Sequence, residues 1–488
     1  MKNHLLKQYI QGRSCEILGL GVSNLPLARL LTEWGISLTV RDKKSPAELG
    51  EEALSLQTKG VSFVSGDGCF DAPKGELIFR SPGIRPDLAG LTAARENGAE
   101  LTSEIELFLQ LTRAETFAIT GSDGKTTSTT LTGKFLSAEA VRSGVGQVFV
   151  GGNIGTPLLD RLGEIGEADR AVMELSSFQL MTVKKAPAYA AITNVSPNHM
   201  DWHNNSMEEY VRAKQNIIGK NTRRLVTNAD CPITASIAAE LLERKRQGKV
   251  DLPAIYLFSS TRASFGELFP NGAGKEDRAI YEKNGTILLS DGRTEEPLLS
   301  VSDIRIPGRH NVENYMTAMA LVYGRVHPSV FSAVAREFYG VEHRLEWIRT
   351  LDGVDYYNSS IDSSPTRTAA ALSALRGRDI VIICGGYDKK LSFEPLAEAL
   401  CRSVRAVVLT GATAEAIRSA LLSHPDYTAG KPEVRVVADF EEAVRAARSL
   451  ARSGGCVLLS PACASFDAFR NFAERGNTFR RIVENFEN

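Results

Sequence analysis

The loop TGSDGKTT at residues 120–127 contains the residue types that proteins use to hold a phosphate chain. It follows an apolar, strand-like run and precedes a helix-compatible stretch at 128–138. Glycines in such a turn let backbone N–H groups approach phosphate oxygens, and a helix N-terminus adds positive potential. A lysine neutralises the β- and γ-phosphates, and a threonine hydroxyl binds magnesium. We therefore predict a nucleotide-phosphate site at Gly121, Ser122, Asp123, Gly124, Lys125, Thr126 and Thr127.

This loop departs from the common GxxxxGK[ST] pattern, because Ile119 stands where that pattern has its first glycine. A glycine-rich turn that binds no ligand is the alternative interpretation. The Gly-Lys-Thr run between a strand and a helix favours phosphate binding.

A carboxylate at residue 174 stands where ligand sites of α/β proteins form. The segment MELSSFQL at 173–180 continues a short apolar run, so Glu174 is expected at the carboxyl end of a strand. Clefts at that end of a parallel sheet hold the ligands of such proteins. Glu174 is therefore a candidate residue of a ligand site, and a solvated carboxylate after an edge strand is the alternative.

The segment NVSPNHMDWH at 194–203 carries His199, Asp201 and His203 at alternate positions. On an extended segment this spacing is compatible with a zinc site. The residues at 206–209 form a capping-box pattern, which predicts the start of a helix that carries Lys214. For Lys214, a place on a solvated helix face is the alternative.

The elements that must position these residues form three series of short apolar runs separated by helix-compatible stretches. This alternation is typical of parallel α/β sheets. The runs lie at 16–20, 37–40 and 76–79, then at 117–120, 171–175 and 189–193, and then at 379–384, 406–409 and 456–459. A surface hairpin or loop is expected at 265–293 and a helix at 311–323.

The length of 488 residues exceeds what one hydrophobic core organises, which predicts about three domains. We expect an α/β protein with a Rossmann-like domain at 1–112, a central P-loop-type ATPase domain at 113–340 and a Rossmann-like C-terminal domain at 341–488.

The overall charge excludes some partners. Lys plus Arg (57) nearly cancel Asp plus Glu (58), so nothing in the net charge of −1 favours nucleic acid or an anionic membrane. The N-terminus lacks the apolar core of a secretory signal, and no stretch approaches the roughly 20 apolar residues that span a bilayer. We expect a cytoplasmic monomer that neither binds nucleic acid nor inserts into a membrane. Seven cysteines without a CxxC pair predict reduced thiols, buried at Cys15, Cys384 and Cys456.

In this order, the motifs resemble those of the Mur ligase superfamily of peptidoglycan synthesis, which also includes folylpolyglutamate synthetase. The TGxxGKTT loop, the MELSSFQL and NVSPNHMDWH segments, PGRHNVENY at 307–315 and VEHRLEW at 341–347 carry the resemblance. It extends from Gly19 to Gly476, with no recognisable landmark from about 221 to 300.

The resemblance implies ATP as co-substrate and Mg²⁺ as metal cofactor. It implies catalytic roles for Lys125, Glu174, His199 and Lys214. In the family, residues equivalent to Thr126 and Glu174 hold magnesium, and the equivalents of His199 and a carbamylated Lys214 support a second ion. Carbamylation turns a cation into the hard oxygen ligand that magnesium prefers. The resemblance thus favours magnesium over zinc, although Asn198 stands where many relatives have Asp. It also implies that Asn311, Asn314 and Arg344 bind ATP.

The segment ILGLGVSN at 17–24 has two glycines of a dinucleotide fingerprint, but Asn24 occupies the third position, which disfavours a Rossmann oxidoreductase. In Mur ligases that add D-glutamate to UDP-N-acetylmuramoyl-L-alanine, a similar loop holds the uridine diphosphate. The resemblance implies UDP-sugar contacts at Gly21, Val22, Ser23, Asp42, Lys43, Lys44, Ser81, Gly83 and Asn153. Lys43 and Lys44 stand where relatives often carry Thr and Arg.

The segment SPACASFDAFRNFAERG at 460–476 resembles the D-glutamate-adding branch and is poorly matched in its sister ligases. It implies a D-glutamate pocket formed by Thr366, Lys389, Ser465, Phe466 and Phe472. Ser364 replaces a common lysine and Tyr387 a common acidic residue.

The implied reaction converts the L-alanine carboxylate to an acyl phosphate, which the amine of D-glutamate attacks. The alternatives are a Mur-type ligase with L-glutamate or another acceptor, and a nucleotide-binding regulatory protein without ligase chemistry.

Overall fold

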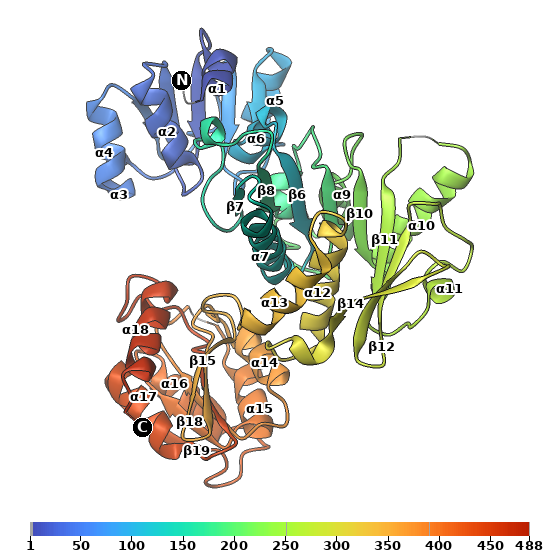
Figure 1. Cartoon of the computed structure of the whole chain (residues 1–488). Helices are drawn as coiled ribbons and strands as arrows, with labels where there is room; N and C mark the ends of the chain where they lie inside the picture. The colour runs from blue at the N-terminus through green and yellow to red at the C-terminus, as the bar shows by residue number, and fades with distance from the viewer. Residues whose placement is uncertain (1–2, 250, 390, 488) are drawn as a thin grey trace. The chain divides into compact units, whose positions relative to one another are not determined.

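The structure is a computed structural model that describes residues 3–249, 251–389 and 391–487. Within this described part, the strands form three sheets (Figure 1). The chain divides into two compact units, Met1–Val301 with Val312–Val334 and Ser302–Asn311 with Ala335–Asn488. The first unit contains two of the sheets and the second unit contains the third.

The first sheet is parallel throughout and has the order β3-β2-β1-β4-β5. Its strands are β1 (Cys15–Leu18), β2 (Leu38–Asp42), β3 (Ser62–Ser65), β4 (Leu77–Arg80) and β5 (Glu100–Thr102). Its helices are α1 (His4–Ile10), α2 (Asn24–Glu33), α3 (Pro46–Leu49), α4 (Glu51–Thr58), α5 (Ala89–Glu96) and α6 (Glu104–Leu111). Every residue of β1 and β4 is buried, as expected for central strands of a parallel sheet covered on both faces. This strand order is typical of a Rossmann-like domain.

The second sheet has the order β14-β13-β12-β11-β10-β9-β6-β8-β7 and is parallel from β7 to β12. Its strands are β6 (Glu115–Thr120), β7 (Val148–Gly152), β8 (Arg170–Glu174), β9 (Tyr189–Ile192), β10 (Arg224–Asn228), β11 (Ala254–Ser259), β12 (Arg278–Lys283), β13 (Thr286–Ser290) and β14 (Glu295–Ser300). Its helices are α7 (Lys125–Ser143), η1 (Leu162–Glu164), α8 (Ser177–Leu180), α9 (Met207–Gln215), α10 (Pro232–Arg246), α11 (Phe265–Leu268), η2 (Val301–Asp303), α12 (Arg309–Val322) and α13 (Pro328–Glu337).

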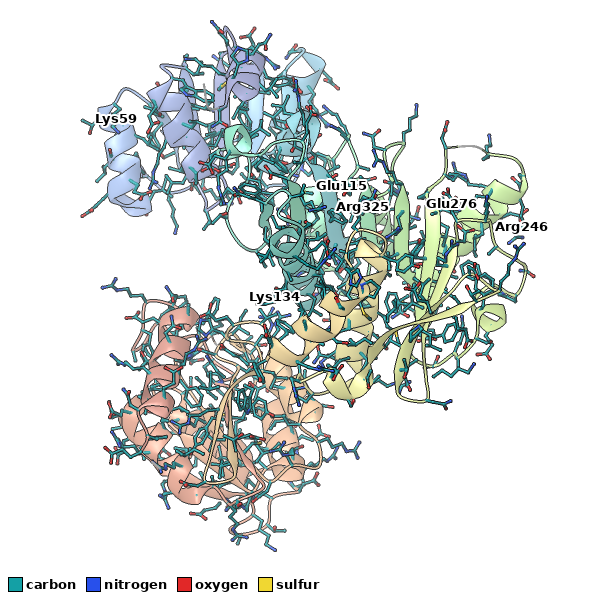
Figure 2. All side chains as sticks on the ribbon, viewed as in Figure 1. Lys59, Glu115, Lys134, Arg246, Glu276 and Arg325 are labelled. Atoms are coloured by element: carbon teal, nitrogen blue, oxygen red, sulfur yellow. The ribbon has the colours of Figure 1, made fainter. Side chains whose placement is uncertain are left out.

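Two contacts tie helices or turns to this sheet. The long helix α7 lies along β7 and β8 (Figure 1). The turn after α12 is tied to the start of β6 by Arg325, whose Nε lies 3.0 Å from Glu115 Oε1 (Figure 2).

The third sheet has the order β15-β16-β20-β17-β18-β19, and only its edge pair β15–β16 is antiparallel within the described residues. Its strands are β15 (Glu346–Leu351), β16 (Val354–Asn358), β17 (Ile380–Cys384), β18 (Ala406–Leu409), β19 (Glu433–Val436) and β20 (Cys456–Leu459). Its helices are α14 (Pro365–Ala374), α15 (Glu394–Ser403), α16 (Ala414–Leu422), α17 (Phe440–Leu450) and α18 (Phe472–Glu484). One hydrophobic cluster joins the sheet to α14, α15 and α16, and another joins it to α17 and α18, so helices cover both faces.

The sequence predicted this fold class correctly, and each of the three predicted ranges supplies the strands of one sheet. The boundaries at 112 and 340 remain a prediction. Strands β12 and β13 form a hairpin inside the expected 265–293 segment. Helix α7 begins at Lys125 rather than at 128, because the phosphate loop passes directly into the helix.

Of the two hydrogen bonds of the predicted capping box at 206–209, one is formed and the other is not. The Ser206 side chain accepts the Glu209 N–H, as expected for a helix N-cap. The Glu209 carboxylate does not return to Ser206. It accepts hydrogen bonds from Arg85 and Asn204 instead, because a guanidinium is a stronger donor than a backbone N–H group.

The described cysteines are free thiols, and Cys15, Cys384 and Cys456 are buried as predicted. Among the described residues, the helices include none with the length and apolar character to cross a bilayer.

A buried carboxylate at the start of α6 joins the first two sheets. Glu104 accepts the N–H groups of Leu158 (2.7 Å) and Leu159 (2.8 Å). Its burial raises the pKa of the carboxyl to about 7, although these two hydrogen bonds act in the opposite direction.

This raised pKa predicts a pH-dependent stability. Because the folded-state pKa lies above the unfolded value of 4.5, Glu104 destabilises the folded state progressively as the pH rises from about 4.5 to about 7. Glu104→Gln keeps an oxygen acceptor and cannot ionise. We expect the variant to gain stability over the wild type at pH 8, by up to about 3 kcal/mol, and little at pH 5. The urea midpoint of unfolding at both pH values measures this, with the exposed Glu208→Gln as control. An equal difference at the two pH values would contradict the prediction.

Candidate active site

The phosphate loop connects β6 to α7 and requires glycine at two positions. Gly124 is the N-cap of α7 with a left-handed φ of 77°, and Gly121 has a φ of 151°. A Cβ atom at Gly124 would overlap Asn314 Oδ1, and one at Gly121 would overlap Thr193 Oγ1. Both glycines are therefore needed for close packing as well as for backbone conformation.

Residues directly after β9 hold this loop. The Ser122 N–H donates to the Asn194 carbonyl and the Asp123 N–H to Asn194 Oδ1, each at 2.9 Å. Thr193 Oγ1 donates to the Asp123 carbonyl at 2.6 Å, and Tyr210 OH lies 3.0 Å from Ser122 Oγ. Sequence reasoning missed these supports. The only signal was the place of Asn194 at the start of the NVSPNHMDWH segment.

Two lysines meet at one carbonyl group of the loop. Lys214 Nζ donates to the Gly121 carbonyl at 2.8 Å, and Lys125 Nζ donates to the Gly121 and Ser122 carbonyls at 3.0 and 2.9 Å. Lys214 is 1% exposed. Burial, followed by the nearby charge of Lys125, lowers the pKa of Lys214 to about 7, while Asp123 and Glu174 act in the opposite direction. Near neutral pH a large fraction of this amine is therefore unprotonated.

Glu174 ends β8, as predicted, and is 1% exposed. Its Oε1 accepts from Asn153 Nδ2 at 2.7 Å, and the Asn153 N–H donates to the Glu174 carbonyl at 2.8 Å. Its Oε2 is buried without a hydrogen-bond partner among the described residues. A buried carboxylate oxygen in this state is suited to a ligand that brings positive charge.

Asn153 is one of the residues predicted to bind the UDP-sugar. It lies after β7 beside Glu174, whereas the other eight lie in the first sheet region. Its contact with the sugar remains a prediction.

The histidine segment separates into an exposed and a buried residue. His199 and Asp201 are exposed, and the His199 ring lies 5.1 Å from the Phe178 ring. His203 is fully buried, with Nε2 2.9 Å from Ser177 Oγ and Nδ1 3.4 Å from Glu209 Oε1. Burial lowers the pKa of His203. Within the described residues no three His, Cys, Asp or Glu side chains are grouped to hold a metal ion, so the zinc arrangement is not formed.

The predicted UDP-sugar loop lies at the carboxyl ends of β1, β2 and β4. Asp42 fixes it, because its carboxylate accepts the N–H groups of Leu20 (2.8 Å) and Lys44 (3.0 Å). The Asn24 amide donates to the Gly19 carbonyl at 2.9 Å, which explains an asparagine at the third fingerprint position. A Cβ at Gly19 would meet Ser81, so the Ser81–Gly83 turn lies against this loop. Ligand crevices of parallel sheets form at such edges.

In the second unit, a buried arginine that sequence reasoning missed holds the loop after β20. Arg475 is 2% exposed. Its guanidinium donates to the carbonyls of Ala464 (3.1 Å), Cys463 (3.1 Å) and Ser360 (2.9 Å), and to Ser360 Oγ (3.0 Å). Arg475 lies in the 460–476 segment, but no spacing in that segment indicates this role.

The predicted D-glutamate residues lie around that loop. Ser465 is 2% exposed, whereas Phe466 is 65% exposed, with its ring 5.9 Å from that of Tyr387. Lys389 Nζ donates to Ser363 Oγ at 3.1 Å, and Thr366 Oγ1 lies 3.3 Å from Ser364 Oγ. Thr366 therefore lies in the first turn of α14, and the Lys389 side chain, which comes from the loop after β17, reaches the turn before this helix.

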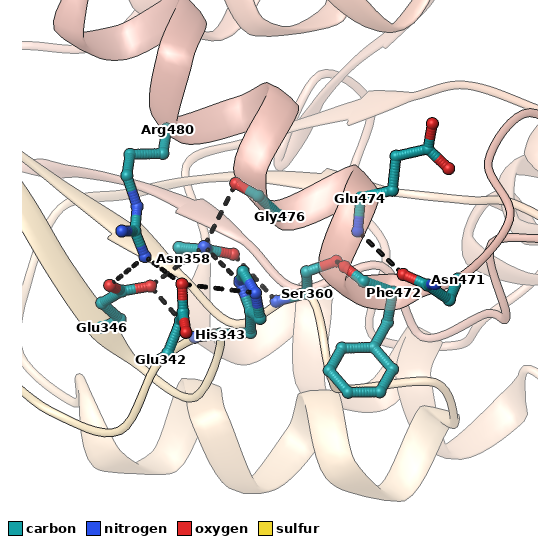
Figure 3. A network of polar contacts seen from close by, with 10 residues as sticks. All are labelled: Glu342, His343, Glu346, Asn358, Ser360, Asn471, Phe472, Glu474, Gly476 and Arg480. Atoms are coloured by element: carbon teal, nitrogen blue, oxygen red, sulfur yellow. Dashed lines mark hydrogen bonds and ion pairs between the residues drawn. The ribbon is translucent and has the colours of Figure 1, made fainter.

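A polar network fixes the segment that carries Arg344 (Figure 3). Asn358 Nδ2 lies 3.0 Å from His343 Nδ1 and donates to the Gly476 carbonyl at 3.3 Å. The His343 and Phe472 rings meet in a T-shaped arrangement with their centroids 5.9 Å apart, and burial lowers the pKa of His343. Arg480 forms ion pairs with Glu342 and Glu346 beside His343. The network links the Arg344 segment to Phe472.

Asn311 and Asn314 lie one turn apart on α12, and both are buried. Asn314 Oδ1 accepts from Ser128 Oγ at 3.2 Å, so it lies at the phosphate loop. Asn311 Nδ2 donates to the Pro307 carbonyl at 2.6 Å.

Two family models match the chain. The Mur ligase middle domain matches residues 119–322, and the Mur ligase, glutamate ligase domain matches residues 343–463. The UDP-N-acetylmuramoylalanine–D-glutamate ligase of Ruminiclostridium cellulolyticum is 40% identical over 99% of this chain and 100% of its own length. The ligase of the same name from Clostridium beijerinckii is 42% identical over 98% of each chain. Among solved structures, the UDP-N-acetylmuramate-alanine ligase MurC of Thermotoga maritima matches with a TM-score of 0.54 at 20% identity, covering 97% of this chain and 98% of that one, which shows a shared fold.

Parallel α/β sheets and a glycine- and lysine-containing phosphate loop are typical of a nucleotide-binding α/β protein. With these full-length similarities, the chain belongs to the Mur ligase family of ATP-dependent ligases.

The two glycines that flank α7 offer a matched pair of substitutions. Gly124→Ala and Gly144→Ala each place a side chain in a left-handed conformation at one end of the helix, which costs about 1–2 kcal/mol. Only the first pushes a methyl group into Asn314, since an added Cβ at Gly144 meets no atom within 4 Å. We expect both variants to lose stability, and only Gly124→Ala to bind ATP at least about tenfold more weakly, or about 1.4 kcal/mol. Calorimetric titration with ATP checks this, and equal ATP affinities would contradict it.

Proposed function

We propose that this ligase joins D-glutamate to UDP-N-acetylmuramoyl-L-alanine, with hydrolysis of ATP to ADP and phosphate, in peptidoglycan precursor synthesis. The observation that carries the choice of amino acid is the identity of about 40%, over nearly the full length, to ligases named for this reaction. The arrangement of Lys125, Lys214 and Glu174 around the phosphate loop supports the ATP chemistry.

Magnesium fits the residues at this loop. The unpartnered Oε2 of buried Glu174 is a hard oxygen donor at the carboxyl end of β8, and oxygen donors are what magnesium prefers. Thr126 and Glu174 would hold one ion, and His199 with Lys214, if carbamylated, would support a second. Bound magnesium would neutralise negative charge on the phosphates during transfer.

The state of Lys214 supports carbamylation. An unprotonated amine can attack carbon dioxide, forming an N–C bond and releasing a proton. The lowered pKa of Lys214 leaves such an amine near neutral pH.

The residues then act by positioning and charge. Residues 121–127, Asn311, Asn314 and Arg344 bind ATP, and Lys125 stabilises charge that develops on the transferred phosphate. The L-alanine carboxylate attacks the γ-phosphorus, and ADP leaves. The amine of D-glutamate attacks the acyl carbon, and phosphate leaves with formation of the amide. In this scheme no side chain forms a covalent bond to substrate.

The two other substrates bind at the remaining predicted residues. The diphosphate and uridine lie at the loop of Gly21, Val22 and Ser23, with Asp42, Lys43, Lys44, Ser81 and Gly83 around it, and Asn153 nearer the reacting end. D-glutamate lies at Thr366, Lys389, Ser465, Phe466 and Phe472, where Lys389 pairs with a carboxylate. We further propose a cytoplasmic monomer without nucleic-acid partners. The net charge of −1 supports the last point, because it gives no general attraction to nucleic acid.

The reaction predicts a defined substrate requirement. We expect ADP release only when UDP-N-acetylmuramoyl-L-alanine and D-glutamate are both present, and much less with L-glutamate. Lys125→Ala should lower the turnover number about 10³-fold, because the charge on the transferred phosphate loses its stabilising cation. Lys134→Ala, an exposed lysine on the same helix, is the matched control and should keep wild-type turnover. A preference for L-glutamate would favour a sister ligase. Wild-type ADP release by Lys125→Ala would reject the assignment of the loop.

The proposed D-glutamate pocket predicts a selective change in the Michaelis constant. Lys389→Gln removes a cation that pairs with a substrate carboxylate, so we expect KM for D-glutamate to rise about tenfold or more. KM for ATP should stay within about twofold. Lys431→Gln, an exposed lysine of the same unit, serves as control. Equal changes in both KM values would show that Lys389 acts on the fold and not on the amino acid.

A further inference from the structure

A pocket lies at the amino ends of strands β6, β9 and β10 of the second sheet, at the opposite edge of this sheet from the phosphate loop. Its volume is about 430 Å³, within the range of small-molecule sites. It is formed by the end of α6 and by the segments that lead into β6, β9 and β10. Strand β6 runs from Glu115 to Thr120, which places the pocket roughly 17 Å from the phosphate loop.

Three threonine hydroxyls fix the walls of this pocket. Thr112 Oγ1 accepts the Ala114 N–H (3.2 Å), and Thr116 Oγ1 accepts the Ala188 N–H (2.9 Å). Thr222 Oγ1 accepts the Gly219 N–H (3.0 Å) and donates to the Pro187 carbonyl (3.1 Å). The three segments are therefore held in shape by their own hydrogen bonds, and a ligand would meet a preformed site.

The charged residues that line the pocket all have the same sign. Arg113, Lys185, Lys220 and Arg223 contribute four cations, and the lining includes no carboxylate among the described residues. The two arginines have only loose partners, since Arg113 lies 3.4 Å from Glu167 and Arg223 lies 3.7 Å from Glu115.

These partners do not neutralise the pocket. Arg113 and Arg223 are 63% and 69% exposed, and exposed ion pairs contribute little. Glu115 is already held by Arg325 at 3.0 Å (Figure 2). Arg223 can therefore turn toward an anion in the pocket at small cost.

Lys185 is the most enclosed of the four cations. Its Nζ donates to the Gln110 carbonyl at 3.2 Å, which leaves two of its three N–H donors for other acceptors. Burial lowers the pKa of this ammonium, so a bound anion would stabilise its charged form.

We propose that this pocket binds a small molecule through a diphosphate or other multiply charged phosphate group. Four cations and, among the described residues, no carboxylate line the pocket, and two of these cations are arginines, whose planar forks match phosphate oxygens. Apolar side chains of Leu109, Ala186 and Ala188 also line it and can contact an organic part of the ligand. The site is separate from the ligase reaction, and its ligand contacts the 112–114 segment that links the first sheet to the second.

Equilibrium dialysis with labelled inorganic pyrophosphate tests this site. The protein should carry Lys125→Ala, so that the phosphate loop contributes little binding. The pocket variant adds Lys220→Gln and Arg223→Gln, both exposed side chains whose replacement should not disturb folding. The matched control adds Lys59→Gln, an exposed lysine of the first sheet region. A separate Lys185→Gln variant tests the enclosed cation.

We expect pyrophosphate to bind the Lys125→Ala protein, and to bind the pocket variant and Lys185→Gln at least tenfold more weakly, with the Lys59→Gln control unchanged. The affinity should fall as salt is added. Competition experiments distinguish an organic phosphate from an inorganic one. If a sugar bisphosphate displaces the labelled pyrophosphate at a lower concentration than inorganic phosphate does, the pocket prefers an organic phosphate. Equal binding by the pocket variant and the control, or no binding by the Lys125→Ala protein at low salt, would overturn the proposal.

Discussion

The arrangement of the active-site residues depends on two lysines that share one backbone oxygen. Lys125 and Lys214 both donate to the Gly121 carbonyl, which brings two ammonium groups close together in a largely buried place. Like charges in low dielectric disfavour each other, and the more buried Lys214 has its pKa lowered to about 7. The Gly121 carbonyl therefore positions two lysine side chains, and one of them, Lys214, is readily deprotonated.

The order of the central strands is what brings these groups together. Strand β6 carries the loop, β8 beside it ends at Glu174, and β9 on its other side continues into Thr193 and Asn194. Because parallel neighbours end at one edge of a sheet, the carboxylate and the loop supports converge from segments 50 to 70 residues away in the chain. Lys214 comes from α9, which is fixed by the Ser206 cap and by Tyr210 against Ser122.

Local patterns in the sequence were sufficient for the α/β class, for the phosphate loop and for Glu174 at a strand end, because each depends on neighbouring residues. The supports by Thr193 and Asn194, and the buried Arg475, could not be predicted in the same way. Their hydrogen bonds cross from one strand or loop to another, and no periodicity marks them. Glu209 shows the reverse case. The local motif correctly predicted the Ser206 N-cap. The Glu209 carboxylate, however, accepts a hydrogen bond from the distant Arg85 guanidinium and not from the Ser206 N–H that the motif predicts.

Two buried cations, Arg475 and Lys214, show how their surroundings separate a structural role from a chemical one. Arg475 and Lys214 are 2% and 1% exposed, and burial lowers the pKa of both. Burial lowers the pKa of Arg475 from 12.5 only to about 10, so its guanidinium stays charged, and it donates hydrogen bonds to three carbonyls and a hydroxyl. Lys214 contacts the Gly121 carbonyl and lies over the Tyr210 ring at 4.5 Å, with Lys125 opposing its charge. A well-solvated buried cation fixes a loop, whereas a poorly solvated one beside a like charge becomes a reactive amine.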